Sequence, residues 1–464
     1  MKDEDLTPET RSAIHRMPST APPDQNAFVG IAGFNAPETE DFLTAGQNAI
    51  LSMTRGKHTR DDRGYPNDLV AAEVCENPCF TVAETTCLTA LEQDARRVDH
   101  LLEGNAERIR RYRRIQDMPL YVYTGLAARK IRNRNQEQWL SMLGAASEVP
   151  DYIELMKISE LLSAAAFLDI NHGNVDKGLD FIEMDMDFYR RMFTGKDAGL
   201  LELRVARNRI ENYALGVSKL IEAGALDLQV HGDRLRRILD PIADPFTHAA
   251  TAVETDSSGH LQIIFDKIVP FQTQDGTLAF ENRSSLFLYS FPLTYRKNMT
   301  LNQMNARAEE TARRIRTMDF QSFPDQVKAL WEERKKSDTK KISSFNIPLL
   351  YQRNGIFFWK NYMGELFMTA DDVDVITHVA KMGDTVVFMH LVRAQLELAL
   401  SGSSSENPPQ TLMHLGPETF NPCTGAPFSW DADKQVLWFE KAGTGETPAQ
   451  VRLPSSKTSR EETP

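Results

Sequence analysis

The fold of this chain is decided by residues 152–193, which read YIELMKISELLSAAAFLDINHGNVDKGLDFIEMDMDFYRRMF. The first half repeats apolar residues at spacings of three and four, the periodicity of a helix with one apolar face. These residues are Leu155, Ile158, Leu161, Leu162, Ala165 and Leu168. A second stripe follows at Val175, Leu179, Ile182, Met186 and Tyr189. Because Gly173 between them favours the left-handed backbone that ends many helices, we predict a helical hairpin that turns at residues 171–174.

This hairpin resembles one unit of the tetratricopeptide repeat family. The residues in matching kinds of position are Leu162, Ala166, Gly173, Gly178 and Ile182. The unit lacks that family's first-helix Trp and terminal Pro, and no second copy follows at a fixed period. We therefore do not expect a regular solenoid. An ordinary antiparallel helix pair within a helical domain is the alternative.

The composition is that of a globular protein. The chain has 464 residues, of which 41% are hydrophobic and 25% are charged, and its length suggests two to three domains. A net charge of −12 argues against nucleic acid as a partner, since phosphate binding needs a dominant basic surface. No window approaches the roughly 20 apolar residues of a membrane span. The first residues do not form a signal peptide, which taken literally indicates a cytoplasmic protein.

Helical patterns continue on both sides of the hairpin. The predicted fold is mainly α, an irregular array of helical hairpins with a small C-terminal β-hairpin around residues 431–434. A polar run at residues 255–259 is expected to interrupt the helices. The expected parts are an extended N-terminal arm at 1–40, a helical domain at 41–335, a C-terminal helical segment with the β-hairpin at 342–442, and a disordered tail at 443–464.

Residues 88–112 alternate apolar positions at spacings of three and four, which predicts one long helix with a coiled-coil-like seam. Arginines cluster toward its C-terminal end, and they are Arg108, Arg110, Arg111, Arg113 and Arg114. Such a basic face binds an anionic membrane surface or an acidic protein partner. The alternative is a solvated face that pairs with the chain's own surplus of acidic residues.

Three of the four cysteines lie close together, at Cys75, Cys79 and Cys87, and Cys423 is distant. A zinc site needs a second pair of ligands, which the neighbouring residues do not supply. A Cys79–Cys87 disulfide would fasten the 77–78 loop to the helix that follows. Free buried thiols are the alternative, and a metal site is a third.

No assembled catalytic signature is present. Neither a Gly-x-Ser-x-Gly elbow nor a His-Glu-x-x-His helix occurs, and we expect no cofactor and no metal. The densest carboxylate cluster is Asp180, Glu183, Asp185 and Asp187. Glu183 and Asp187 share a helix face, where they could hold a hard cation or exchange protons. The alternative is a solvated stripe neutralised by Arg190 and Arg191.

Three segments together resemble an uncharacterised family of bacterial envelope proteins. They are residues 25–37, the cysteine-then-arginine segment from Cys79 to Arg114, and the Asn-Pro-x-Thr-Gly-x-Pro-Phe-x-Trp block at 421–430. The resemblance implies an N-terminal membrane anchor with the body in the periplasm. This sequence departs from that pattern, because Met1 stands where the anchor would have just ended. The resemblance carries no activity.

From these patterns we expect a non-catalytic binding or scaffold protein of the bacterial cell envelope. It would act through helical-hairpin surfaces on a protein partner, in the periplasm and next to the inner membrane. One alternative is an envelope-acting hydrolase that uses carboxylates and histidines from different helices. Another is an immunity protein that inhibits a toxin, which would form a tight one-to-one complex. The location would be cytoplasmic if no anchor precedes this sequence.

The disulfide is directly testable. Closing so short a loop removes unfolded-state freedom worth about 2–3 kcal/mol when the geometry is unstrained. Non-reducing peptide mapping of protein expressed in the periplasm is expected to find Cys79 bonded to Cys87. Finding four free thiols would contradict the bridge and remove the main reason within the sequence for an oxidising compartment.

Overall fold

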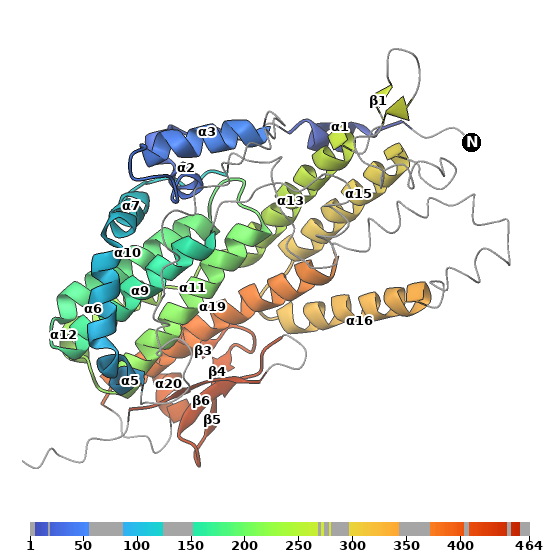
Figure 1. Cartoon of the computed structure of the whole chain (residues 1–464). Coiled ribbons are helices and arrows are strands. Elements are labelled where there is room, and N and C mark those ends of the chain that lie inside the picture. The colour runs from blue at the N-terminus through green and yellow to red at the C-terminus, as the bar shows by residue number, and fades with distance from the viewer. Residues whose placement is uncertain are drawn as a thin grey trace, which may run out of the picture.

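The structure, a computed structural model, describes residues 5–16, 19–54, 87–123, 152–267, 271–272, 278–279, 297–342, 372–402, 408–442 and 447–454. Within these ranges the chain is mainly α, as predicted (Figure 1). The helices before the hairpin are α1 (Pro8–Ile14), α2 (Ala27–Ala32), α3 (Phe42–Thr54), α5 (Cys87–Gln93), α6 (Ala95–Gly104) and α7 (Ala106–Gln116). From the hairpin on they are α9 (Tyr152–Asn171), α10 (Val175–Phe193), α11 (Leu200–Glu222), α12 (Leu228–Ile238), α13 (Pro245–Lys267), α15 (Lys297–Arg316), α16 (Phe323–Ile342), α19 (Asp372–Leu400) and α20 (Pro408–Leu415).

The predicted hairpin is present as α9 and α10. Gly173 in the turn has a φ of 86°, the left-handed conformation that its sequence position suggested. Gly178 lies where the two helices cross, since a Cβ there would come within 2.5 Å of the Ala166 carbonyl oxygen. The backbones can approach this closely only because residue 178 has no side chain.

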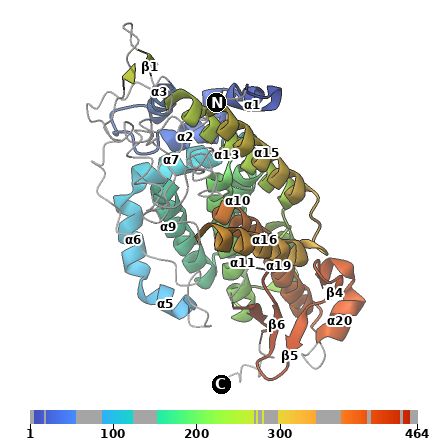
Figure 2. The ribbon, with the colours of Figure 1, turned by 90° about the vertical axis from the view of Figure 1, so that its right-hand side faces the viewer.

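The hairpin packs into a larger bundle rather than standing alone. α10 lies against α11, α11 against α19, and α13 against both α15 and α19 (Figure 1). Figure 2 shows α5 and α6 beside α9, on the other side of the molecule from α20 and its neighbouring strands. One apolar cluster runs through all of these layers, from Ala27 to Leu453. The predicted division near residues 336–341 is therefore not a break in the core, and it falls within α16.

The predicted extended arm at residues 1–40 is wrong for the part that the structure describes. α1, the 3₁₀ turn η1 (Pro23–Gln25) and α2 fill much of it, and Phe28 and Ile31 are buried in the core. The side chain of Asn26 explains the attachment. Its amide nitrogen donates to the Val122 carbonyl at 2.9 Å and its oxygen accepts from the Val122 N–H at 3.0 Å. A buried amide that pairs both ways with one distant residue fixes the arm in place.

The predicted long helix at residues 88–112 is also wrong, because it is divided into α5, α6 and α7. The second break falls at Asn105, whose side-chain amide donates to the Leu101 carbonyl at 2.8 Å. A short amide side chain competes with the helix for backbone partners in this way. The seam positions remain apolar, and Leu91, Val98 and Tyr112 are buried.

The polar run at residues 255–259 does not interrupt a helix but lies inside α13. Ser258 is buried and its hydroxyl donates to the Glu254 carbonyl at 2.8 Å. A hydroxyl satisfied by its own helix can stay in the helix interior without another partner. The apolar residues that follow, to residue 267, continue the same helix.

The C-terminal β-hairpin is present as β5 (Ser429–Asp431) and β6 (Val436–Phe439), with Trp430 opposite Leu437. A third strand, β7 (Ala449–Arg452), pairs antiparallel with β6. The predicted disordered tail at 443–464 is therefore wrong for residues 449–452. Gln395 of α19 donates to the Arg452 carbonyl at 2.6 Å and joins this sheet to the bundle. Two shorter pairs complete the described strands, β1 (Phe271–Gln272) with β2 (Leu278–Ala279) and β3 (Phe420–Asn421) with β4 (Ala426–Pro427).

α19 is the longest described helix and passes through the middle of the bundle (Figure 1). By length and composition Val375–Leu400 is apolar enough to cross a membrane, yet 72% of its most apolar window is buried inside the protein. Its contacts with α11, α12, α13 and α16 are those of a core helix. Cys87, at the start of α5, is buried. Cys79 lies outside the described residues, so the Cys79–Cys87 disulfide stays a prediction.

The packing of α2 on α3 makes a prediction at Gly46. A Cβ at this position would lie 2.1 Å from the Val29 carbonyl oxygen, and backbone cannot move aside as a side chain can. We expect Gly46→Ala to lower the free energy of unfolding by about 2–3 kcal/mol, as overpacked sites do. Gly104→Ala is the control, because nothing lies within 4 Å of its Cβ position. Urea unfolding checks both variants, and equal stabilities would contradict the α2–α3 contact.

Candidate functional site

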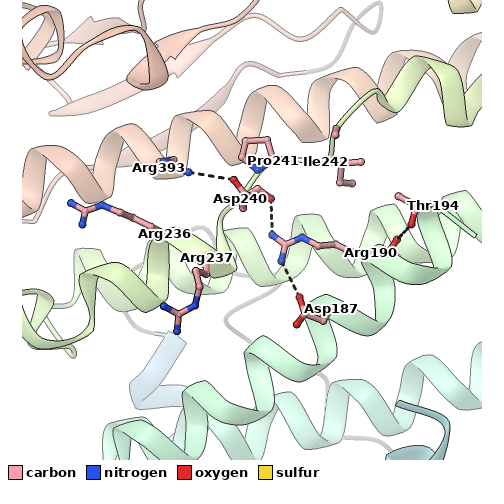
Figure 3. A pocket seen from close by; sticks show the side chains of 10 residues that line it. Asp187, Arg190, Thr194, Arg236, Arg237, Asp240, Pro241, Ile242 and Arg393 are labelled. Atoms are coloured by element: carbon pink, nitrogen blue, oxygen red, sulfur yellow. Dashed lines mark hydrogen bonds and ion pairs between the residues drawn. The ribbon is translucent and has the colours of Figure 1, made fainter. Parts of the chain in front are cut away.

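The candidate site is an open pocket of about 530 Å³ where α10, α12 and α19 meet the loop between α12 and α13 (Figure 3). We call it the arginine pocket. It is lined by Asp187, Arg190, Thr194, Arg236, Arg237, Asp240, Pro241, Ile242, Ala243 and Arg393. Four guanidinium groups and two carboxylates from three separate stretches of the chain therefore share one hollow.

The end of α12 and the loop after it are held by Arg190 of α10. Its Nη2 donates to the carbonyl oxygen of Ile238 at 2.7 Å and to that of Asp240 at 2.6 Å. The last carbonyls of a helix have no partners within the helix, and a cation there also faces the negative end of the helix dipole. The loop that carries Asp240 is thus fixed to the hairpin through its backbone.

Charges alternate along the floor of the pocket. Arg190 pairs with Asp187 at 3.4 Å through its Nη1, and Nη1 of Arg393 lies 3.6 Å from the Asp240 carboxylate. Figure 3 shows Arg190 and Arg393 approaching Asp240 from opposite sides. Burial lowers the pKa of the Arg190 guanidinium, while Asp187 and Asp240 act against this shift. The two carboxylates are largely exposed and the two guanidinium groups are largely buried.

The other two arginines are engaged by acids outside the pocket. Arg236 binds Glu397 of α19 with two bonds of 2.6 and 2.8 Å. Arg237 lies 3.1 Å from Glu183 of α10, and its side chain is 63% exposed. Figure 3 shows both side chains directed away from Asp240. They place positive charge at the rim, and Arg237 is the more accessible of the two.

Arg393 is the least satisfied cation of the pocket. Its Nε is buried and has no hydrogen-bond partner among the described residues, and its ion pair with Asp240 is long. A guanidinium offers five N–H donors in a planar fork that suits an anion with two oxygens, and it keeps its charge at any physiological pH. The chemistry that this arrangement supports is anion recognition.

The arginines predicted from sequence do not form one basic face. Arg111 is buried and donates to the carbonyls of Phe34 at 3.0 Å and Pro37 at 3.1 Å. Arg108 is buried too, and it lies 3.8 Å from Glu154. These two hold the N-terminal segment and α9, and are not available to a partner.

The remaining three, Arg110, Arg113 and Arg114, are exposed. Arg110 pairs with Glu107 of its own helix, and the guanidinium of Arg114 lies over the Phe42 ring, 5.2 Å from its centroid. The predicted anion-binding patch is thus reduced to one exposed edge of α7.

The carboxylate cluster of α10 is neutralised by arginines, as the alternative interpretation held. Glu183 contacts Arg234 at 2.9 Å and Arg237 at 3.1 Å, so α12 supplies most of the compensating charge. Arg191 donates to the Gln116 carbonyl, and the charge of Asp187 also acts on it. Among the described residues no group of three His, Cys, Asp or Glu side chains is placed to hold a metal ion.

Asp185 departs from this pattern because it points into the core and is fully buried. Ser159 of α9 donates to its carboxylate at 2.6 Å, and Tyr112 and Gln116 of α7 and Tyr213 of α11 donate as well. Burial, followed by the charge of Asp185, raises the pKa of the neighbouring Tyr189 to about 12. The tyrosines therefore remain protonated donors. Four helices meet at this one carboxylate.

No sequence pattern indicates the arginine pocket. Arg190 and Arg393 belong to helices that lie far apart along the chain, and neither stands within a recognisable motif. The buried role of Asp185 was also missed. A partial signal existed, since Asp185 stands directly before Met186 of the predicted apolar stripe and so borders the inward face.

No protein-family model, curated protein or solved structure matched this chain. The resemblance to an envelope family therefore stays a prediction, and the likeness of the hairpin to a tetratricopeptide unit does too. What the site can do is argued from its own geometry.

The contrast between Asp185 and Asp187 gives the next prediction. Asp185→Ala would remove the acceptor that four buried donors share and a counter-charge near the buried Arg209. We expect a loss of about 3–5 kcal/mol in the free energy of unfolding. Asp187→Ala, two residues along the same helix, removes an exposed ion pair and should cost less than about 1 kcal/mol. Chemical denaturation of the two variants measures the difference, and similar losses would refute the central role of Asp185.

Proposed function

We propose that this protein is a non-catalytic binding or scaffold protein that holds an acidic segment of a protein partner in the arginine pocket. The observation that carries the proposal is the under-satisfied Arg393 in a hollow that it shares with three further arginines. Among the described residues the Nη1 of Arg393 has a single ion pair, at 3.6 Å to Asp240, and an incoming carboxylate would accept a shorter charge-assisted hydrogen bond from it. Arginine is also enriched among the residues that dominate protein–protein interfaces.

The shape of the pocket fits a segment of a protein. Pro241, Ile242 and Ala243 form an apolar wall next to the charged floor. Apolar walls take the methylene groups of a side chain, whereas the guanidinium groups take its carboxylate. The pocket lies on α10 of the central hairpin, which agrees with an interaction through helical-hairpin surfaces.

A place in the bacterial cell envelope completes the proposal, and it is supported by the resemblance of three sequence segments alone. An envelope hydrolase is the competing function. It would need a free carboxylate or histidine to exchange protons with a substrate. In the arginine pocket both carboxylates face guanidinium groups, and this favours binding over proton transfer.

The proposal is tested with a fluorescein-labelled hexaglutamate peptide, whose fluorescence anisotropy reports binding. The wild-type chain is expected to bind it, and raising the salt concentration should weaken binding because the contacts are charged. Arg393→Met keeps the aliphatic stem and removes the guanidinium. Because Arg393→Met loses one charge-assisted contact, it should weaken peptide binding by about tenfold. Adding Arg237→Ala to it should weaken binding further.

The control is Arg313→Ala, which removes a 66% exposed arginine of α15 that pairs with Glu310 and lies outside the pocket. It should leave the affinity unchanged within about twofold, as expected for a distant surface charge. Thermal melting verifies that each variant is folded. Equal weakening by Arg313→Ala and Arg393→Met would show non-specific attraction and refute the pocket. A partner that binds tightly in a one-to-one complex would instead favour an immunity protein.

A further inference from the structure

We propose that Asp240 occupies the anion position of the arginine pocket in the free protein, and that the partner's carboxylate must displace it. This inference rests on the proposed function and deepens it. Asp240 would be the residue that sets the affinity of the pocket, and a carboxylate would be the group that the pocket selects.

The backbone and the side chain of Asp240 are held by different contacts. The backbone carbonyl is bound by Arg190 at 2.6 Å, which fixes the loop. Among the described residues the one ion pair of the carboxylate is the 3.6 Å contact with Arg393, and its side chain is 72% exposed. Exposed ion pairs of this length are weak. The side chain can therefore turn into solvent by rotation about its own bonds, with the loop left in place.

A competing carboxylate would find the arginine side chains already in position. Once the Asp240 side chain has turned away, Arg393 presents its Nη1 donors to the pocket, because Asp240 was their ion-pair partner. Arg190 keeps its position because it is bound to backbone oxygens and not to the departing group. The exchange replaces one carboxylate with another at the Arg393 guanidinium.

The apolar wall formed by Pro241, Ile242 and Ala243 favours an organic carboxylate over an inorganic phosphate, because the wall can pack against the methylene groups of a side chain. The expected ligand is thus a glutamate or aspartate side chain of the partner.

Asp240→Asn removes the competing charge and keeps the shape of the side chain. We expect it to tighten the binding of the labelled hexaglutamate peptide by about fivefold, the scale of one exposed ion pair. Asp176→Asn is the matched control. It changes the net charge equally, and its 83% exposed side chain lies 3.7 Å from Arg234, with both residues outside the pocket lining. It should change the affinity by less than about twofold, since exposed charges beyond the contact are screened by salt.

Three outcomes are distinguishable. If neither the wild-type chain nor Asp240→Asn binds the peptide, the proposed function fails and this inference fails with it. If the wild-type chain binds in an Arg393-dependent way and Asp240→Asn binds no more tightly, Asp240 does not compete and this inference alone is overturned. If both aspartate variants tighten binding equally, net charge explains the gain and displacement is again overturned.

The ligand class is tested by competition in the same assay. Glutarate is expected to displace the labelled peptide at lower concentration than inorganic phosphate does. Stronger competition by phosphate would overturn the selection of a carboxylate. Adding Arg393→Met to Asp240→Asn should abolish the gain, because the competitor and its target are then both absent. A gain that persists would place the binding outside the arginine pocket.

Discussion

The interior of this bundle depends on one buried carboxylate. Asp185 accepts hydrogen bonds from α7, α9 and α11 while belonging to α10, so the relative positions of four helices are fixed at one point. Burying an ion is unfavourable unless its hydrogen-bonding capacity is filled, and here it is filled by hydroxyl and amide donors. The buried Arg209 donates to Tyr213 at 3.3 Å and adds a counter-charge one step away. An apolar core alone would tolerate small shifts between helices, whereas this network does not.

One face of α10 places Asp185 and its hydrogen bonds in the core, and another face of the same helix lines the arginine pocket. Asp185 faces the core, and Asp187, two residues later, faces the pocket beside Arg190. Because α10 cannot rotate without breaking the hydrogen bonds of Asp185, the direction in which Arg190 projects is fixed as well. Arg190 then holds the end of α12 and the backbone of Asp240. The position of the pocket thus follows from the polar core through one helix and one arginine.

Local periodicity correctly predicted the elements that depend on residues close together in the sequence. It failed for the elements whose structure depends on contacts with distant residues. The α9–α10 hairpin and the β5–β6 hairpin were predicted because their apolar spacing and turn residues lie within one short stretch. The strand β7 was missed, because its polar sequence becomes a strand only through pairing with β6. The pocket could not be predicted, since Arg190 and Arg393 meet only through the packing of α10, α12 and α19. The run of arginines at residues 108–114 was predicted to form one basic face and does not, because the burial of Arg108 and Arg111 depends on partners elsewhere.

An acidic chain with a net charge of −12 can hold a specific anion site only if its arginines are kept from its own acids. In the arginine pocket the arginines are only partly separated from acidic residues, and each guanidinium contacts a partner of its own within the protein. Arg236 is committed to Glu397 by two short bonds and Arg190 to backbone carbonyls, so both serve to build the site. Within the described part of the chain, the one ion pair of Arg393 is its long contact with the exposed Asp240 carboxylate. Because the other cations are already engaged, the site is preorganised, and a ligand need not order them as it binds.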